Sequence, residues 1–371
     1  MELVPYNAAY VERLASWQPG NRFALLHRTV QLNPFDAESW IQLGLATEMQ
    51  QRDIPSAGRY YLKAAEVDHM FLPKWTLTNF YFRQQNAGAF FDWAKATLAI
   101  TPYAADPVFT QMWLMSQDPQ KIAAAIPDKA GVLIQYASFL SNTHQYAAIP
   151  PIVRRLVKAA GNRNPADYGR DDQIGPAEDH LLAAGDLRAA LDIWEAMRAG
   201  GWVNLPAPTT ANPLNNGDFH SSFLRHGFDW TPVSSVGVTT DQFLDQKAVR
   251  ITFSGTEPDR CTLLQQYVPV EANGDYQLQW RATAEGIEQP SGVAWHVYPV
   301  PNNSENSLIS GDLLIHASGG WNFKAPANTN LSLLALEYTR PLGSVRAVGN
   351  FTLQAVSLKK RDDAVAPRPV R

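Results

Sequence analysis

The chain has 371 residues, of which 45% are hydrophobic, 11% aromatic and 18% charged, as in folded globular proteins with about two or three domains. A net charge of −4 argues against a nucleic-acid-binding protein, which usually carries an excess of basic residues. A single cysteine, Cys261, excludes an intramolecular disulfide and a zinc site built on several thiolates.

The N-terminal residues carry no targeting signal that the sequence reveals. Residues 1–5 lack the basic and apolar regions of a signal peptide, and no apolar run of about 18 residues predicts a membrane span. Taken literally, this predicts a cytoplasmic protein. The alternative is a periplasmic or envelope-associated protein from which an N-terminal anchor has been removed.

A repeat of helical character occupies the first part of the chain, where apolar residues recur at helical spacing. Residues 40–44 (WIQLG) have the W-x-x-L-G spacing of the first helix of a tetratricopeptide repeat. Trp75 lies 35 residues after Trp40, and Val108 lies 33 residues after Trp75. Degenerate hairpins are expected at 132–160 and at 179–198.

The side-chain sizes within the repeat explain why such hairpins would stack. Small residues such as Gly44 and Ala57 let two helices approach closely, while Trp40 and Tyr61 are large enough to fill the space between hairpins. One hairpin cannot bury its apolar face alone, so neighbours must pack together. We therefore expect residues 1–200 to form an α-solenoid of tetratricopeptide-like hairpins.

Arrays of this kind bind protein partners on a concave surface that the first helices line. The polar residues at first-helix positions are Gln42, Asn79, Arg83 and Gln111, and we predict that they contact a protein partner. Asn79 is the most informative, because asparagine is otherwise disfavoured inside a helix. A merely solvated surface is the alternative.

The pattern changes after residue 200. Residues 201–232 are rich in Pro, Gly and Asn, which predicts a linker and the first segment of a second domain. Apolar residues then alternate along short runs separated by turn signals, as in 276–280 and 293–298. This favours an antiparallel β-sandwich, or jelly roll, over 233–361, followed by a disordered tail at 362–371.

The order of four segments in this half resembles the galactose-binding-like carbohydrate-binding modules. The segments are Asn216-Gly217-Asp218-Phe219, Gly227-Phe228-Asp229-Trp230, Gln265-Gln266-Tyr267-Val268-Pro269-Val270 and Gly274-Asp275-Tyr276-Gln277-Leu278. The resemblance implies that the first segment opens the domain and that the strands of the last two form a hairpin. Related modules often carry a structural calcium, and Asp218 would be its ligand here; no other cofactor is expected.

The combination of the two halves also resembles bacterial envelope proteins associated with exopolysaccharide. Such proteins occur near exopolysaccharide or protein-sorting systems, and this second resemblance implies a location outside the cytoplasmic membrane, behind an N-terminal anchor.

Sugar binding needs flat aromatic faces and planar amide or guanidinium groups. The two strand-like runs place Gln277, Gln279 and Arg281 opposite core residues on one strand, and His296 and Tyr298 on the other. If these strands are neighbours, the five side chains form one polar surface. Two tryptophans in Gly-rich surroundings are expected as loop platforms, so the candidates for glycan binding also include Trp230 and Trp321.

The sequence contains no motif with catalytic spacing. The motifs G-x-S-x-G and H-E-x-x-H and the phosphate-binding glycine loops are all absent. We therefore expect a non-catalytic binding or scaffold protein. The alternative is a polysaccharide-active enzyme using sandwich carboxylates, of which Glu337 is the most unusual because it follows the apolar run 333–336. A hydrogen-bonded structural carboxylate is favoured for Glu337. A third reading is that the sandwich only caps the helical array.

Overall fold

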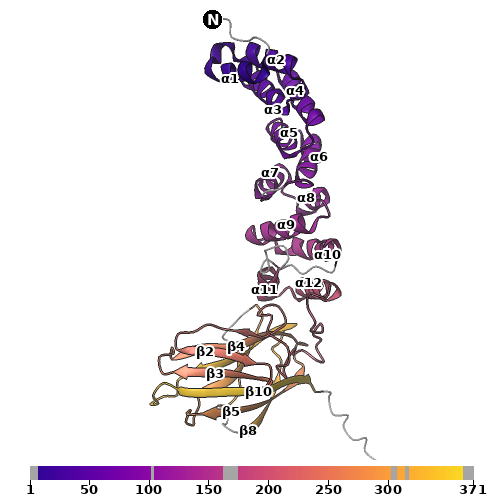
Figure 1. The fold of residues 1–371 in the computed structure, drawn as a ribbon. Coiled ribbons are helices and arrows are strands. Elements are labelled where there is room, and N and C mark those ends of the chain that lie inside the picture. Colours follow the sequence, from indigo (N-terminus) through magenta and orange to yellow (C-terminus); the bar gives the residue numbers. More distant parts are fainter. Residues whose placement is uncertain (1–6, 102–103, 162–173, 302–306, 314–316, 362–371) are drawn as a thin grey trace, which may run out of the picture. The chain divides into compact units, whose positions relative to one another are not determined.

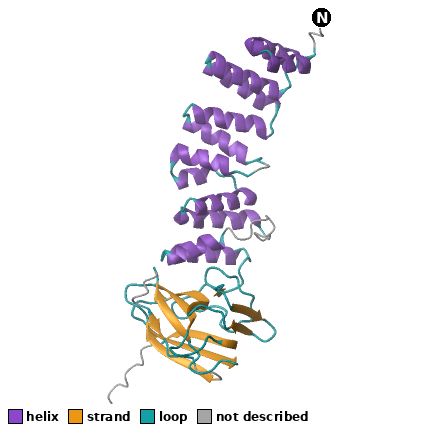
Figure 2. Cartoon of the chain, turned by 90° about the vertical axis from the view of Figure 1, so that its left-hand side faces the viewer, coloured by secondary structure: helices purple, strands orange, loops and turns teal. Residues whose placement is uncertain are grey.

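The computed structural model describes residues 7–101, 104–161, 174–301, 307–313 and 317–361. They form two compact units, residues 1–143 and 144–371. The first contains helices only, and the second contains helices followed by two β-sheets (Figures 1 and 2). Within the described ranges, every helix is too short or too polar to span a bilayer.

The first unit is a stack of helical hairpins, in which α1 packs on α2, α3 on α4 and α5 on α6. The predicted first-helix positions Trp40, Trp75 and Val108 fall on α3, α5 and α7, which confirms the repeat. The helices are α1 (Ala8–Trp17), α2 (Arg22–Leu32), α3 (Ala37–Ala46), α4 (Ile54–Val67), α5 (Phe71–Arg83), α6 (Ala87–Leu98), α7 (Asp106–Ser116), α8 (Pro119–Ala125) and α9 (Ala130–Asn142), with a 3-10 turn at Pro19–Asn21 and a π-helical turn at Thr47–Gln51.

Local sequence signals set these helices in place. The side chains of Asp36, Asp53 and Asn86 accept backbone N–H bonds at the starts of α3, α4 and α6, which satisfies donors that a helix leaves free. A Cβ at Gly44 would lie 2.6 Å from the buried ring of Tyr61. The glycine therefore lets α4 cross α3 closely, as the small-and-large pattern predicted.

The second unit begins with a 3-10 turn at Tyr146–Ala148 and the helices α10 (Ile149–Ala160), α11 (Gly175–Ala183) and α12 (Leu187–Ala199). The predicted hairpin at 179–198 is confirmed, and its turn lies at Gly185. The strands are β1 (Thr231–Pro232), β2 (Val238–Phe243), β3 (Ala248–Ser254), β4 (Arg260–Pro269), β5 (Asp275–Glu285), β6 (Val293–Pro299), β7 (Leu308–Ile309), β8 (Ala317–Lys324), β9 (Leu331–Thr339) and β10 (Val348–Lys360).

The strands form two five-stranded antiparallel sheets, which confirms the predicted sandwich. Sheet I has the order β1-β4-β9-β6-β7, and sheet II has the order β2-β3-β10-β5-β8. Inward-facing residues of both sheets share one core, which includes Trp280 and Trp295. Phe219 and Trp230 join this core, so the segment 201–232 carries the first part of the sandwich.

The implied hairpin between the two strands that contain Tyr267 and Tyr276 is wrong. Strand β4 pairs with β1 and β9 in sheet I, whereas β5 pairs with β10 and β8 in sheet II. The connection at 270–274 therefore crosses from one sheet to the other.

The helices end at Ala199 and the strands begin at Thr231, yet the compact unit that holds the strands already begins at residue 144.

A buried junction joins the last helical hairpin to the loop before β1. Glu178 on α11 is fully buried, and its Oε2 lies 3.1 Å from Nδ1 of His226. The neighbouring Asp179 accepts the backbone N–H of Gly227 at 2.7 Å. Trp194 on α12 is also fully buried and lies 6.4 Å from the His226 ring. The hairpin is thus fixed to the sandwich by buried polar and aromatic contacts.

Candidate functional site

The outer face of sheet I carries a polar cluster on its three central strands. Because side chains alternate along a strand, the core residues Leu334 and Leu336 on β9 point inward. Leu333, Ala335 and Glu337 therefore point outward. The antiparallel register places each of these next to a residue of β4 and a residue of β6.

Three rows of side chains cross this face, each centred on β9. The first is Tyr267–Leu333–Tyr298, the second is Gln265–Ala335–His296, and the third is Thr262–Glu337–Ala294. Arg260 begins β4 beyond the third row, opposite Thr339. Cross-strand neighbours on one face lie within side-chain contact, so the strands themselves bring the polar groups together.

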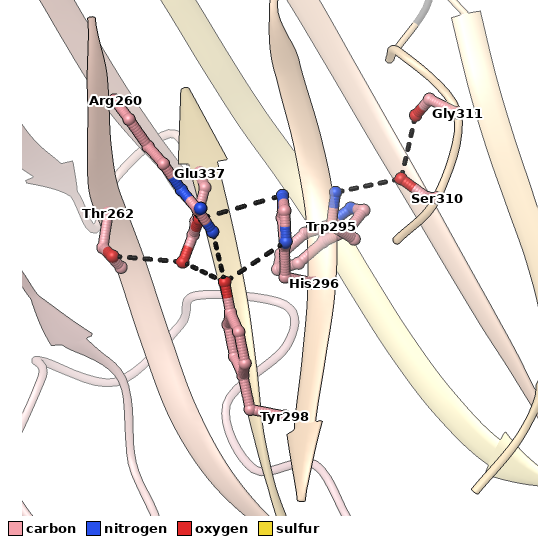
Figure 3. Close-up of polar contacts among 8 residues, drawn as sticks. All are labelled: Arg260, Thr262, Trp295, His296, Tyr298, Ser310, Gly311 and Glu337. Carbon is pink, nitrogen blue, oxygen red and sulfur yellow. Dashed lines mark hydrogen bonds and ion pairs between the residues drawn. The ribbon is translucent and has the colours of Figure 1, made fainter. Parts of the chain in front are cut away.

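Glu337 is the centre of this cluster (Figure 3). Its Oε2 accepts N–H bonds from Nε and Nη2 of Arg260 at 3.1 and 2.9 Å. Its Oε1 accepts the hydroxyl of Tyr298 at 2.8 Å and that of Thr262 at 3.3 Å. Nη2 of Arg260 also donates to the Tyr298 hydroxyl at 2.8 Å, and Nδ1 of His296 lies 3.3 Å from that hydroxyl. Every member of the cluster is fixed by at least one other.

The protonation states follow from burial and from the ion pair. Burial and the hydrogen bond to Glu337 raise the pKa of Tyr298 to about 12, so its hydroxyl stays protonated. Burial, with the charge of Arg260, lowers the pKa of His296 despite the opposing charge of Glu337. His296 is therefore neutral at pH 7. The hydrogen bond and charge of Glu337 raise the pKa of Arg260, which keeps its guanidinium charged.

The cluster borders a groove of about 460 Å³. Its floor is the strand surface, and its polar wall is the Glu337 network. The lining residues are Arg260, Cys261, Thr262, Gln265, Tyr298, Leu333, Ala335 and Glu337. Such a groove offers planar donors and acceptors beside a small apolar floor, which is the chemistry of a binding site for a polyhydroxylated ligand.

The five polar residues predicted to form one surface lie on two different sheets. Gln277, Gln279 and Arg281 belong to β5 in sheet II, while His296 and Tyr298 belong to β6 in sheet I. The single surface is therefore wrong, because these two strands are consecutive along the chain but not neighbours in a sheet. His296 and Tyr298 belong to the Glu337 cluster. Gln279 and Arg281 border a separate hollow of about 650 Å³.

The two tryptophans predicted as loop platforms are not exposed platforms. Trp230 is completely buried, its ring lies 6.2 Å from that of Trp295, and its Nε1 donates to the carbonyl of Asn216 at 3.1 Å. Trp321 is half-buried on strand β8, with its ring 4.7 Å from that of Phe323. The Gly-rich flanks indicated loops, but Trp230 lies in the sandwich core and Trp321 packs against that core.

Asp218, the predicted calcium ligand, has its Oδ1 2.6 Å from Nδ1 of His220. Both side chains are more than half exposed. Within the described part of the chain, no three His, Cys, Asp or Glu side chains are grouped so that they could hold a metal ion. A structural calcium at Asp218 stays a prediction of the family resemblance.

The four predicted partner-contacting residues of the first unit form hydrogen bonds between and along its helices. Gln111 donates to Asn79 at 2.7 Å, which links α7 to α5. Arg83 donates to both oxygens of Glu48 at 2.9 and 2.7 Å, and Gln42 accepts from Arg22 at 2.9 Å. These side chains thus tie helices of the array together. Contact with a protein partner stays a prediction.

Sequence reasoning missed three polar residues of the groove, Arg260, Thr262 and Gln265. Glu337 stood out because an acid inside an apolar run is unusual, and its hydrogen-bonded state agrees with the favoured reading. Its partner lies on another strand 77 residues away in the sequence. The only signal was a buried carboxylate that required a positive partner.

No protein-family model and no curated protein matches the chain. Among solved structures, a CBM4 protein is similar over 40% of this chain and 99% of its own, with 11% identity and a TM-score of 0.31. PilF of Pseudomonas aeruginosa covers 52% of this chain and 97% of its own at 16% identity and a TM-score of 0.28. YrrB, a tetratricopeptide-repeat protein, is similar over 47% of this chain and 91% of its own, with 14% identity and a TM-score of 0.24. Because these TM-scores are low, the fold stands on the helices and strands themselves.

Proposed function

We propose that this chain is a non-catalytic binding protein whose sandwich holds a glycan in the sheet I groove and whose helical array holds a protein partner. The observation that carries the proposal is the Glu337 network, which fixes Arg260 and Tyr298 beside an open groove. Side chains held in one conformation lose little entropy when they bind a ligand. The site is thus preorganised for hydrogen bonding.

The groove suits sugars because it offers both polar and apolar contacts. The amide of Gln265 and the hydroxyl of Thr262 can each donate to and accept from sugar hydroxyls. Leu333 and Ala335 supply an apolar floor against which the C–H face of a sugar ring can lie. Neither feature requires a chemical step, so recognition alone accounts for the arrangement.

A glycosidase would need a second acid in the groove. Hydrolysis of a glycosidic bond commonly uses two carboxyl groups about 5 to 9.5 Å apart, one of which donates a proton. Among the described residues that line the groove, Glu337 is the single carboxylate. Its two oxygens are occupied by Arg260, Tyr298 and Thr262. This supports a binding role over the enzymatic alternative.

The proposal is tested by titrating the full chain with polysaccharides in affinity electrophoresis and calorimetry. The variant Gln265→Ala removes a groove amide without touching the Glu337 network, and we expect it to weaken binding about fivefold to tenfold. Gln279→Ala is the matched control, since Gln279 lies on the outer face of sheet II. Equal affinity of the Gln265→Ala variant and the wild type would reject the sheet I groove.

The helical array would supply the scaffold function through its first helices, in a setting such as envelope polysaccharide assembly. The hydrogen bond from Gln111 to Asn79 links two of these first helices, α7 and α5. In affinity capture, we expect the full chain and its Gln265→Ala variant to recover the same protein partner. The Asn79→Ala variant should not recover it. A partner that binds all three equally would locate the contact elsewhere.

A further inference from the structure

We infer that the ligand of the sheet I groove is an acidic glycan, whose sugar carboxylate binds the guanidinium of Arg260. This rests on the proposed function and names the class of ligand.

The Arg260 side chain is held in place, but not all of its N–H donors have a partner among the described residues. A guanidinium carries five N–H donors. Nε donates to Glu337, and Nη2 donates to Glu337 and to Tyr298. Nη1 has no hydrogen-bond partner among the described residues, and the Arg260 side chain is 59% exposed. Two donors of an immobilised cation therefore remain for a ligand in the groove that Arg260 lines.

The charges at this end of sheet I are unevenly exposed. They include three arginines, Arg260, Arg340 and Arg346, and four carboxylates, Asp259, Glu257, Glu337 and Asp312. The Glu337 side chain is only 7% exposed and Glu257 is fully buried, whereas the Arg340 and Arg346 side chains are 39% and 45% exposed. Both arginines share one exposed carboxylate, that of Asp259. Of the two charged residues that line the groove, Arg260 is therefore exposed to a ligand and Glu337 is buried.

An anionic sugar binds these donors more strongly than a neutral sugar, whose hydroxyls can accept the same N–H bonds but carry no charge. A carboxylate can accept the N–H bonds of Nη1, and a charge-assisted bond is about twice as strong as a neutral one. The ring hydroxyls can still bind Gln265 and Thr262, the neutral polar groups of the groove. Arg260 cannot offer both terminal nitrogens to one carboxylate, because Nη2 is already occupied. The geometry therefore favours a ligand carboxylate that binds the guanidinium through Nη1 alone.

The test compares each acidic polysaccharide with its methyl ester, which lacks the negative charge and carries an added methyl group. The full-length protein is titrated at neutral pH with polygalacturonate and with alginate, each beside its methyl-esterified form. We expect the free acids to bind about tenfold more tightly, with a preference that salt reduces. In Arg260→Gln the preference should disappear, while Arg281→Gln, on the outer face of sheet II, should keep it. A cooperative thermal unfolding transition shows that each variant is folded.

The outcomes separate the inference from the proposed function. Equal affinity for acid and ester, with weaker binding of both by Gln265→Ala, would overturn the acidic ligand and leave the glycan groove standing. A preference for the acids that is lost in Arg281→Gln but kept in Arg260→Gln would also overturn it, because the carboxylate would bind elsewhere. If these acids, their esters and neutral polysaccharides all fail to bind, both proposals are rejected.

Discussion

The junction between α11 and the sandwich should become less stable as the pH rises, and Glu178→Gln should remove most of this dependence. Burial raises the pKa of Glu178 to about 7 from 4.5, although the hydrogen bond and charge of His226 oppose the shift. Burial lowers the pKa of His226, but Glu178 and the nearby Asp179 and Asp229 outweigh it and raise that pKa above 6.5. The folded junction therefore holds protons that the unfolded chain has already lost.

The sign and size of the effect follow from this difference. Because the pKa of Glu178 is raised on folding, Glu178 lowers the stability of the folded junction as the pH rises above 4.5. The pKa of His226 is also raised, so its stabilisation is present below pH 6.5 and is lost as the pH rises through the raised pKa. For Glu178 alone, the shift makes the folded junction less stable at about pH 8 than at about pH 5 by roughly 2 kcal/mol. His226 acts in the same direction.

Hydrogen exchange followed by mass spectrometry can measure this in the full chain. Peptides that cover α11 and α12 should exchange faster at about pH 8 than at about pH 5, after correction for the intrinsic rate. Glu178→Gln keeps the shape of the side chain without its titration, so its opening free energy should vary much less. Glu195→Gln, on the exposed face of α12, is the control and should behave as wild type. Identical pH dependence in wild type and Glu178→Gln would refute the reasoning.

Three further substitutions test packing and the site. Gly44→Ala places a Cβ 2.6 Å from the buried Tyr61 ring and should cost about 1–3 kcal/mol of unfolding free energy, as measured by urea denaturation. Gly319→Ala, which would overlap the indole of Trp280, should lower the melting temperature of the sandwich at a similar cost. Glu337→Ala leaves its buried hydrogen-bond partners unpaired and should cost about 3 kcal/mol and abolish glycan binding in calorimetry. Wild-type stability of any of the three would contradict the corresponding contact.

The elements of the fold could be predicted because their signals are local. The spacing from Trp40 to Trp75 placed the first helices of two hairpins, and the run around Tyr276 to Trp280 placed an inward-facing strand. Periodicity reports which side chains share a face of one helix or strand. It needs no knowledge of the rest of the chain.

The pairing of strands could not be predicted in the same way. β4 pairs with β9, which begins more than sixty residues after β4 ends, and β5 and β6 lie in different sheets. Glu337 and Arg260 therefore meet through a register that no short segment encodes. The prediction for Trp230 was wrong for a related reason. Its Gly-rich neighbourhood indicated a loop, and only the folded core shows that the carbonyl of Asn216 accepts its indole N–H.

The central claim is that the outer face of sheet I binds a glycan, and a hydrogen-exchange footprint of the full chain with saturating polygalacturonate tests it most directly. We predict slower exchange in peptides covering β4, β6 and β9, with no change in β5, β8 and β10. Protection confined to the strands of sheet II would contradict the claim.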